Sequence, residues 1–273
     1  MTSTLKVLSP LIIIPLIILL ASCTKDDSGI MSDMPVVEAY LQPGSQITVK
    51  VSRKSPTDEN ETLPARDLDH LVVTVYYAGS WYTLIPVGEG IYSDTTGLIP
   101  VVPDSAYLLK FNWDESVVTS STLIPAKPAG VSLSDTSISM YQWDPDDPPA
   151  GQHPDPVTIS FTNDDDSYYL ATIECLETDP VPVFKDSTYV NDMFSSRPTT
   201  DDVIDINPMS IRYFGRNRII LFHINPEYST FFMRQMSTSQ NYQDPPTNIT
   251  NGLGIFTGIH SDTLYLRVIQ KTK

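Results

Sequence analysis

The chain is poor in cysteine, in histidine and in positive charge, and each shortage excludes a class of site. It has two cysteines among 273 residues, Cys23 and Cys175. If Cys23 serves as a lipid attachment point, one thiol remains, which excludes an intrachain disulfide and a cysteine-based zinc site. The four histidines lack metal-ligand spacing such as two residues four apart on a helix. We therefore predict no metal site and no cofactor.

Positive charge is scarce, because 17 lysines and arginines face 33 aspartates and glutamates, for a formal net charge of −16. Binding to nucleic acid depends on lysine and arginine against phosphates, so nucleic acid is not an expected partner. The same acidity disfavours electrostatic attachment to an anionic membrane surface. Any membrane association must then come from a hydrophobic anchor.

No apolar run is long enough for a membrane-spanning helix, which needs about 20 residues. The longest, Val7 to Leu20, is shorter and contains Pro10 and Pro15, which break helices. Lys6 precedes this run and small residues follow it, as in a cleavable signal peptide. We therefore predict a signal peptide at residues 1–22, with an uncleaved anchor as the alternative.

The segment Leu20-Ala21-Ser22-Cys23 has the form of a bacterial lipobox. It predicts cleavage before Cys23 and lipidation of that residue, whereas the alternative is an ordinary secreted protein. Each buried acyl methylene contributes about 0.8 kcal/mol and a single chain attaches only marginally, so the two or three chains of a lipoprotein cysteine give lasting attachment. Residues 23–34 are polar and predict a flexible tether.

Three residues of this tether, Lys25, Asp26 and Asp27, resemble the acidic export signal of surface lipoproteins in Bacteroidota. The resemblance implies display on the outer face of the outer membrane. A solvated linker on the periplasmic face remains the alternative.

From Pro35 onward, short segments of alternating apolar and polar residues predict β-strands. Turn sequences such as Pro43-Gly44 separate them. The strands expected in the first block are 35–41, 46–51, 70–78, 81–87, 90–94, 106–113 and 116–124. Short strands without helical periodicity indicate an antiparallel sandwich of the immunoglobulin or transthyretin type. The linker Pro125–Pro128 ends this block, which we predict to be a domain of residues 35–128.

Residues 129–273 predict a second antiparallel β-domain, so the fold class is mostly β with two domains. Its expected strands lie within 131–143, 157–162, 168–177, 210–213, 218–224, 254–259 and 263–269, with hairpins at 163–166 and 214–217. One helix is expected at about residues 226–240, because Asn225 suits an N-cap and Pro226 the first helical position. Its apolar face would consist of Tyr228, Phe231, Phe232 and Met236.

Several motifs invite a chemical interpretation, but each has a structural alternative that we favour. Cys175 and His223 lie in apolar strand patterns, which indicates packing for the first and a hydrogen-bonded structural role for the second. Gly252-Leu253-Gly254 lacks the strand and helix that flank a dinucleotide-binding loop. The sequence lacks the Gly-x-Ser-x-Gly motif that holds the nucleophilic serine of many hydrolases. We predict no catalytic residues.

Acidic and aromatic residues provide the remaining candidates for ligand binding. A calcium site is conceivable at Asp144, Asp146, Asp147 and Asp155, although the EF-hand glycine and glutamate are missing and a solvated loop is the favoured interpretation. Tyr76, Tyr77, Trp81 and Tyr82 cluster in one predicted hairpin, and Trp113, Tyr141 and Trp143 lie elsewhere. Exposed aromatic rings could stack on sugars or anchor a partner, whereas packing in a sandwich core is the favoured expectation.

The closing segment Asn248–Phe256, with Asn251, Gly252, Gly254 and Phe256, resembles the signature of a Bacteroidota lipoprotein family known as domain of unknown function 4249. Three further segments resemble that family in the same order: Val36–Leu41, Tyr107–Leu109 with Thr122–Pro125, and Glu227-Tyr228. The resemblance implies a lipoprotein of the outer membrane or cell surface, encoded in many genomes beside TonB-dependent transporters. It supplies no catalytic residues.

We therefore expect a non-enzymatic binding or accessory module that is attached to the membrane through Cys23 and serves a TonB-dependent outer-membrane transporter. An adhesin-like structural protein and a hydrolase are the alternatives. The glycines at 252 and 254 are expected to form a turn that delivers Ile255 and Phe256 into the C-terminal core.

Overall fold

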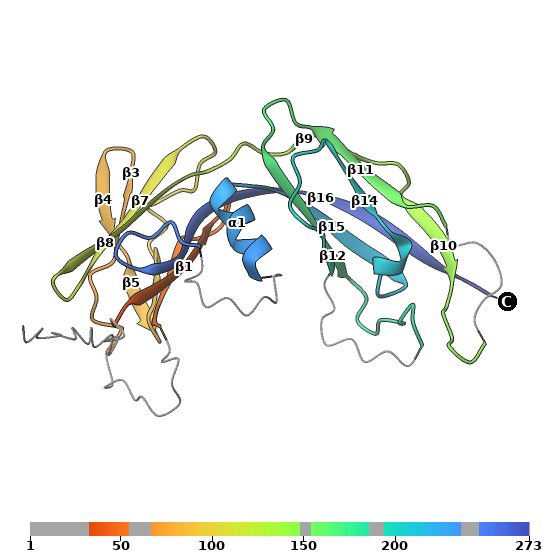
Figure 1. Ribbon diagram of the computed structural model, residues 1–273, viewed down its shortest axis with the longest axis horizontal. Coiled ribbons are helices and arrows are strands. Elements are labelled where there is room, and N and C mark those ends of the chain that lie inside the picture. Colours follow the sequence, from red (N-terminus) through yellow and green to blue (C-terminus); the bar gives the residue numbers. More distant parts are fainter. Residues whose placement is uncertain (1–32, 55–66, 148–153, 186–193, 236–245, 273) are drawn as a thin grey trace, which may run out of the picture. The chain divides into compact units, whose positions relative to one another are not determined.

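The computed structural model describes residues 33–54, 67–147, 154–185, 194–235 and 246–272, which fold into layered β-sheets (Figure 1). The predicted signal peptide and most of the predicted tether therefore lie outside the described residues. Within the predicted tether, residues 23–34, Asp33 is bound to the first core, because its carboxylate accepts a hydrogen bond from Arg53 Nε at 2.7 Å and its backbone carbonyl accepts one from Trp113 Nε1 at 2.6 Å. The predicted mostly-β class is confirmed.

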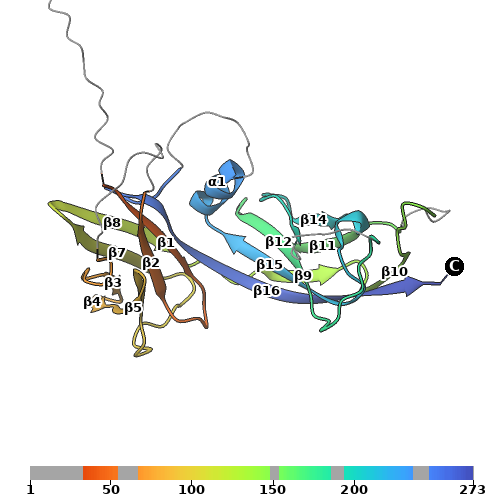
Figure 2. The same ribbon diagram turned by 90° about the horizontal axis from the view of Figure 1, so that it is seen from below.

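A first core lies between two groups of strands. One group is β1 (Pro35–Leu41), β2 (Thr48–Arg53), β6 (Ile91–Ser93) and β5 (Ile85–Gly88), and the other is β4 (Ser80–Thr83), β3 (Thr74–Tyr77), β7 (Ala106–Trp113) and β8 (Ser116–Leu123). Residues alternate strictly between buried and exposed along β7, as the period of a half-buried strand requires. Tyr107, Leu109, Phe111 and Trp113 thus enter the core. Figure 2 shows β7 beside its neighbour β8.

A second core lies between β12 (Tyr168–Cys175), β15 (Gly215–Ile224), β16 (Leu253–Lys271) and β10 (Ser137–Tyr141) on one side and β14 (Val203–Ile206), β11 (Val157–Thr162) and β9 (Ala129–Leu133) on the other. The two-residue strand β13 (Phe194–Ser195) pairs with β12. Ile159, Ile206, Ile219 and Leu221 are fully buried in this core. Asp33–Lys273 forms one compact unit around both cores.

Strand β16 belongs to both cores (Figure 1). Its first residues, Leu253–Gly258, pair in parallel with Val36–Leu41 of β1, and its later residues pair antiparallel with β15 and in parallel with β10. Phe256 packs in the first core, so the expectation that it enters the C-terminal core is wrong. The expected break at residues 260–262 is also wrong, because β16 runs unbroken over 19 residues.

Gly254 allows β1 and β16 to approach each other. It has a φ of 98°, and a Cβ at this position would lie 1.9 Å from the carbonyl oxygen of Val37. Gly252 has no positive φ, but its backbone approaches Pro35 closely enough for an added Cβ to lie 3.1 Å from the Pro35 carbonyl oxygen. Of these two glycines, Gly254 is the one that combines a left-handed backbone with close contact to the facing strand.

The helix α1 (Pro226–Gln235) begins where the sequence predicts, while its expected end near residue 240, with Met236, lies outside the described residues. The backbone carbonyl of Asn225 accepts hydrogen bonds from the amides of Tyr228 and Ser229. Its side chain reaches away and donates to the carbonyls of Leu123 and Gly258 at 2.8 and 3.1 Å. Within the described ranges, no helix has the length and apolar character that crossing a membrane requires.

The prediction of a hairpin turn at residues 214–217 is wrong. Residues 208–210 form a 3-10 turn, and β15 begins at Gly215 and pairs with β12 and β16 instead of with residues 210–213. Asn217 is buried within β15, and its amide donates to the carbonyls of Tyr213 and Gly215 at 3.3 and 3.2 Å. These bonds satisfy a residue that ordinarily marks a turn.

Gly254→Ala should lower the melting temperature of the mature protein, purified in detergent, more than Gly44→Ala does. Gly44 is the matched control, since its φ is 81° and an added Cβ would meet nothing within 4 Å. A left-handed backbone alone costs about 1–2 kcal/mol for an L-residue, whereas Gly254→Ala also forces β1 away from β16. Equal losses in thermal denaturation would contradict a close approach at Gly254.

Candidate functional site

An aromatic residue lies exposed on the outer face of the four-stranded sheet. Trp81 of β4 is 50% exposed, although its place in a predicted sandwich strand favoured burial in the core. Trp113 follows that expectation at 3% exposed, and Trp143 is half-buried. The expectation of a core position is therefore wrong for Trp81. Trp113 shares the alternation of Tyr107, Leu109 and Phe111 along β7, whereas the four residues of β4 show no such alternation that would have placed Trp81.

Strand register gathers a set of side chains around Trp81. Trp81 lies opposite Tyr76 of β3, and Tyr76 lies opposite Leu108 of β7. In the adjoining row Thr74 lies opposite Lys110, and Thr74 Oγ1 donates to the Lys110 carbonyl at 2.8 Å. We use the name Trp81 face for the outward surface formed by Val72, Thr74, Tyr76, Trp81, Lys110 and Asn112.

The indole of Trp81 has defined neighbours on this face. Its centroid lies 5.3 Å from that of Tyr76, with a tilt of 57° between the rings, and Lys110 Nζ lies 5.7 Å from the indole centroid. A cation at this distance from an aromatic ring is attracted by the negative face of the ring. Such contacts restrict the rotamers of Trp81 without covering it.

A hollow of about 270 Å³ adjoins Trp81 and is lined by Val72, Thr74, Trp81, Lys110, Phe111 and Asn112. The lining combines one exposed aromatic ring, that of Trp81, with a hydroxyl, an amide and an ammonium group, and Lys110 contributes its one charge. Beneath it, Leu109 and Phe111 are buried in the first core. Tyr77 stacks on buried Tyr107 at 4.9 Å, and burial raises the pKa of Tyr107. The hollow therefore rests on a packed base.

Two other hollows have polar groups that are already engaged. In one, of about 500 Å³, the Asp94 carboxylate accepts bonds from the Thr96 hydroxyl at 2.6 Å and the Ile99 amide at 2.8 Å. Burial alone would raise the pKa of Asp94, but these bonds outweigh it and lower that pKa. In the other, of about 350 Å³, Lys185 is paired with Asp144 at 2.7 Å. The first of these hollows has no aromatic lining residue, whereas the second includes Tyr141, whose ring centroid lies 5.5 Å from Lys271 Nζ.

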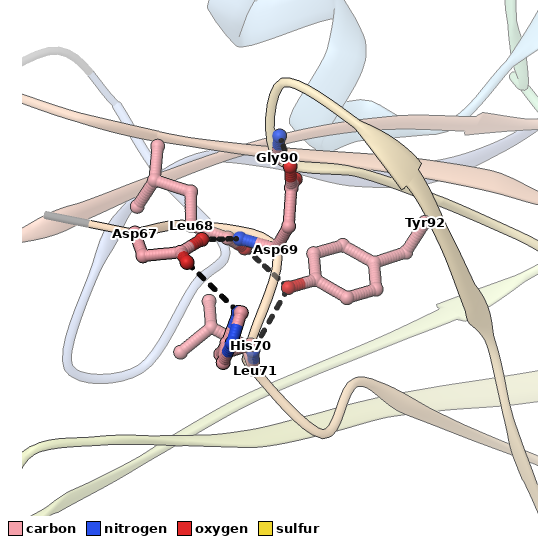
Figure 3. Close-up of polar contacts among 7 residues, drawn as sticks. All are labelled: Asp67, Leu68, Asp69, His70, Leu71, Gly90 and Tyr92. Carbon is pink, nitrogen blue, oxygen red and sulfur yellow. Dashed lines mark hydrogen bonds and ion pairs between the residues drawn. The ribbon is translucent and has the colours of Figure 1, made fainter.

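A histidine and an aspartate meet near β6, as in a hydrolase, but their surroundings are structural (Figure 3). His70 Nδ1 lies 2.9 Å from Asp67 Oδ2, and their side chains are 81% and 60% exposed. The neighbouring contacts attach this segment to the sheet, since Tyr92 Oη donates to the Leu68 carbonyl and accepts from the Leu71 amide (Figure 3). An exposed pair lacks the shielding that activates a general base.

The other described histidines hold the linker between the two cores. His223 and His260 lie opposite each other on β15 and β16, and their Nδ1 atoms donate to the carbonyls of Ala126 and Pro125 at 2.9 and 3.1 Å. Burial lowers the pKa of His223, an effect that the bond to Ala126 opposes. These contacts agree with a structural role for His223. His153 lies outside the described residues.

Among the described residues, no group of three or more histidine, cysteine, aspartate or glutamate side chains could hold a metal ion. Part of the acidic loop considered for calcium, residues 148–153, is not described. Cys175 ends β12 and is partly exposed, with Sγ 4.0 Å from the Phe214 carbonyl oxygen. Cys23, Lys25, Asp26 and Asp27 also lie outside the described residues.

Several of the segments that carry the family resemblance meet at α1, while Tyr107–Leu109 lies within β7. Glu227 Oε1 accepts hydrogen bonds from the hydroxyls of Thr122 and Thr257 at 3.3 and 3.0 Å. Tyr228 contacts Tyr40 edge to face at 5.7 Å, and burial, with Glu38 and Tyr228 nearby, raises the pKa of Tyr40 to about 12. The carboxylate of Glu227 is thus used to join β8 and β16 to the helix. Sequence spacing could not reveal this junction, because it joins α1 to three strands that are distant in the sequence, β1, β8 and β16.

Asn251 contributes to the same junction from the loop before β16. It has a φ of 59°, and its side-chain amide donates to the Val117 carbonyl at 2.9 Å. Asn248 exchanges two hydrogen bonds with the backbone of Phe256, at 2.7 and 3.0 Å. The asparagines and glycines of the closing segment therefore shape the backbone that leads into β16.

These features define a β-protein with two cores, a structural junction at the resembling segments and an exposed aromatic surface elsewhere. The sequence matches the family described as Domain of unknown function (DUF4249) over residues 27–264, and the chain belongs to this family. A comparison with curated proteins finds no match.

Two solved structures show a distant similarity to this chain. The chicken CNTN1 FN1–FN3 domains are 10% identical with a TM-score of 0.26, and the match covers 71% of this chain and 59% of that one. A mutant of Salmonella alpha-2-macroglobulin is 10% identical with a TM-score of 0.23, and covers 88% of this chain and 15% of that one. We draw no argument from similarity at this level.

Trp81→Ala should leave the stability of the mature protein nearly unchanged, whereas Trp113→Ala should be strongly destabilising. An exposed side chain away from the core contributes little, so we expect a loss within about 1 kcal/mol for the first variant. A buried tryptophan truncated to alanine costs about 3–5 kcal/mol. Chemical denaturation of the two variants checks the difference, and a large loss for Trp81→Ala would make Trp81 a structural residue.

Proposed function

We propose that this protein is a lipid-anchored, non-enzymatic binding module of the outer membrane that presents the Trp81 face to the cell exterior. The observation that carries the proposal is the half-exposed indole of Trp81, ordered by Tyr76 and Lys110 beside a hollow. Tryptophan is prominent among residues that dominate binding energy, because it offers a large, rigid contact area. Single exposed apolar residues are common, but this one is surrounded by groups that can orient a ligand.

The anchor in this proposal is lipid on Cys23, supported by the lipobox sequence and by the shortness of the preceding apolar run. Lys25, Asp26 and Asp27 serve as the signal for export to the outer face. The undescribed segment up to Ser32 then connects the lipid to Asp33, which Arg53 and Trp113 bind to the first core. A ligand captured on the Trp81 face is passed to a TonB-dependent transporter in the same membrane.

Replacing the lipidated residue tests the anchor. Cys23→Ala should leave residues 1–22 attached after exposure to the lipoprotein signal peptidase and should move the protein out of the washed membrane fraction. Labelling with a radioactive or clickable fatty acid should be lost at the same time. Normal processing with continued membrane attachment would contradict the lipobox interpretation, and Cys175→Ser, which retains the lipobox, provides the control.

Purification of the epitope-tagged, full-length lipoprotein from detergent-solubilised outer membranes tests the accessory role. We expect a TonB-dependent transporter to be enriched by wild type and equally by Trp81→Ala, because the Trp81 face holds the ligand and not the transporter. Mass spectrometry with an unrelated tagged lipoprotein as the control measures this enrichment. Absence of any transporter would contradict the accessory role, and adhesion to a matrix without a transporter would favour an adhesin.

A further inference from the structure

We propose that the hollow on the Trp81 face is a subsite for one pyranose ring of a glycan. This inference rests on the proposed function, since it names the class of ligand that the Trp81 face takes. A pyranose has a flat patch of C–H groups on one or both faces and hydroxyl groups around its rim. It therefore requires an aromatic ring for the C–H patch and hydrogen-bonding groups at the edges of that ring.

Trp81 supplies the ring in a preorganised position. Half of its surface is exposed, yet Tyr76 at 5.3 Å and Lys110 at 5.7 Å restrict its orientation. The three strands that carry these residues are paired residue by residue and are backed by the buried side chains of Val75, Leu109 and Phe111. A surface that is already ordered loses little conformational entropy when a ligand binds, which suits a weakly hydrophobic ligand such as a sugar.

The rim of the hollow matches the two-way hydrogen bonding of sugar hydroxyl groups. The hydroxyl hydrogen of Thr74 is used in its bond to the Lys110 carbonyl, so Oγ1 offers lone pairs to a sugar hydroxyl. The exposed side chain of Asn112 offers both an acceptor and donors, and the Lys110 ammonium offers donors. These three residues lie on the adjacent strands β3 and β7 and line the same hollow as Trp81.

Other ligand classes fit this site less well. At about 270 Å³ the hollow is smaller than the roughly 300–1,000 Å³ typical of sites for larger organic ligands. A divalent cation needs oxygen ligands with carboxylates among them, and the six lining residues include none. A stable protein interface buries about 800 Å² on each partner with an apolar centre, whereas polar Thr74, Lys110 and Asn112 interrupt this face.

The test uses the mature lipoprotein in detergent and affinity electrophoresis through gels that contain single soluble polysaccharides, including starch, xylan, galactomannan, hyaluronan and mucin glycans. At least one should retard wild type. Trp81→Ala should weaken that interaction about tenfold or more, and Asn112→Ala should weaken it by a smaller factor. Tyr265→Ala is the matched control, since this tyrosine is 63% exposed on β16, outside the Trp81 face.

Melting temperatures equal to that of wild type would show that the variants are folded. The glycan subsite would be overturned if no polysaccharide retards the wild-type protein, or if Trp81→Ala is retarded as strongly as wild type. Trp81-dependent capture of a peptide or protein in place of a glycan would also overturn it. The transporter purification distinguishes failure of the glycan subsite from failure of the accessory role. If a transporter copurifies but no glycan binds, only the subsite is refuted. If a glycan binds but no transporter copurifies, only the accessory role is refuted.

Discussion

The pairing of β1 with β16 is the interaction on which the rest of the structure depends. Over six residues the two strands run in parallel, with Gly254 allowing the backbone of β16 to approach Val37. Beyond this pairing β16 continues against β15, so one uninterrupted strand contributes Phe256 to the first core and Leu266 and Val268 to the second. A displacement of β16 would therefore be felt in both cores, because close-packed interiors transmit strain.

Polar contacts support this pairing from the side of α1. Thr257, fully buried on β16, donates to Glu227, which also accepts from Thr122 at the end of β8. The linker that follows β8 is held by His260, His223 and the pair of Lys127 with Asp262, whose atoms lie 3.0 Å apart. A buried polar group that is fully hydrogen-bonded specifies one arrangement, since any other would leave it unsatisfied. The segments that resemble the family are thus architectural.

The outward side chains of the Trp81 face do not belong to the first hydrophobic core. The strands of this face contact the remainder of the protein through the buried residues of the alternate positions, such as Val75, Leu109 and Phe111. The outward positions can then vary in chemistry at little cost in stability, because substitutions on an exposed strand face away from the core change stability only slightly. If the proposed binding surface lies on a sheet other than that of β16, the closing segment Asn248–Phe256 would provide no clue to a ligand.

The sequence predicted well those parts of the fold that depend on local pattern. The bounds of β1, β7 and β11 coincide with the segments in which apolar and polar residues alternate, and α1 begins at the predicted Pro226. It failed where tertiary contacts outweigh local preference. His260 and Asp262 looked like loop residues, but they lie within β16 and bind the linker. Asn217 looked like a turn residue, but it is buried in β15 with its amide satisfied by backbone carbonyls.

For the candidate site, the sequence could predict that several aromatic residues lie in one hairpin, but not which of them are exposed. The sequence places Tyr76, Tyr77, Trp81 and Tyr82 in one hairpin, but it does not say which of them face solvent. Tyr77 stacks inward on Tyr107, whereas Tyr76 and Trp81 lie on the outer face beside Lys110. The register of β3 against both β4 and β7 decides this, and register depends on the whole sheet.

Fluorine NMR of the mature protein labelled with 5-fluorotryptophan tests the central claim most directly, because the chain has three tryptophans and only Trp81 lies on the proposed binding face. Trp81→Phe and Trp143→Phe variants would assign the resonances. On addition of the polysaccharide that retards the protein most in affinity gels, or of a pooled hydrolysate of all those tested, we predict that the Trp81 resonance shifts while those of Trp113 and Trp143 stay in place. A Trp81 resonance that remains unmoved while another shifts, or three unmoved resonances at saturating concentration, would contradict the account.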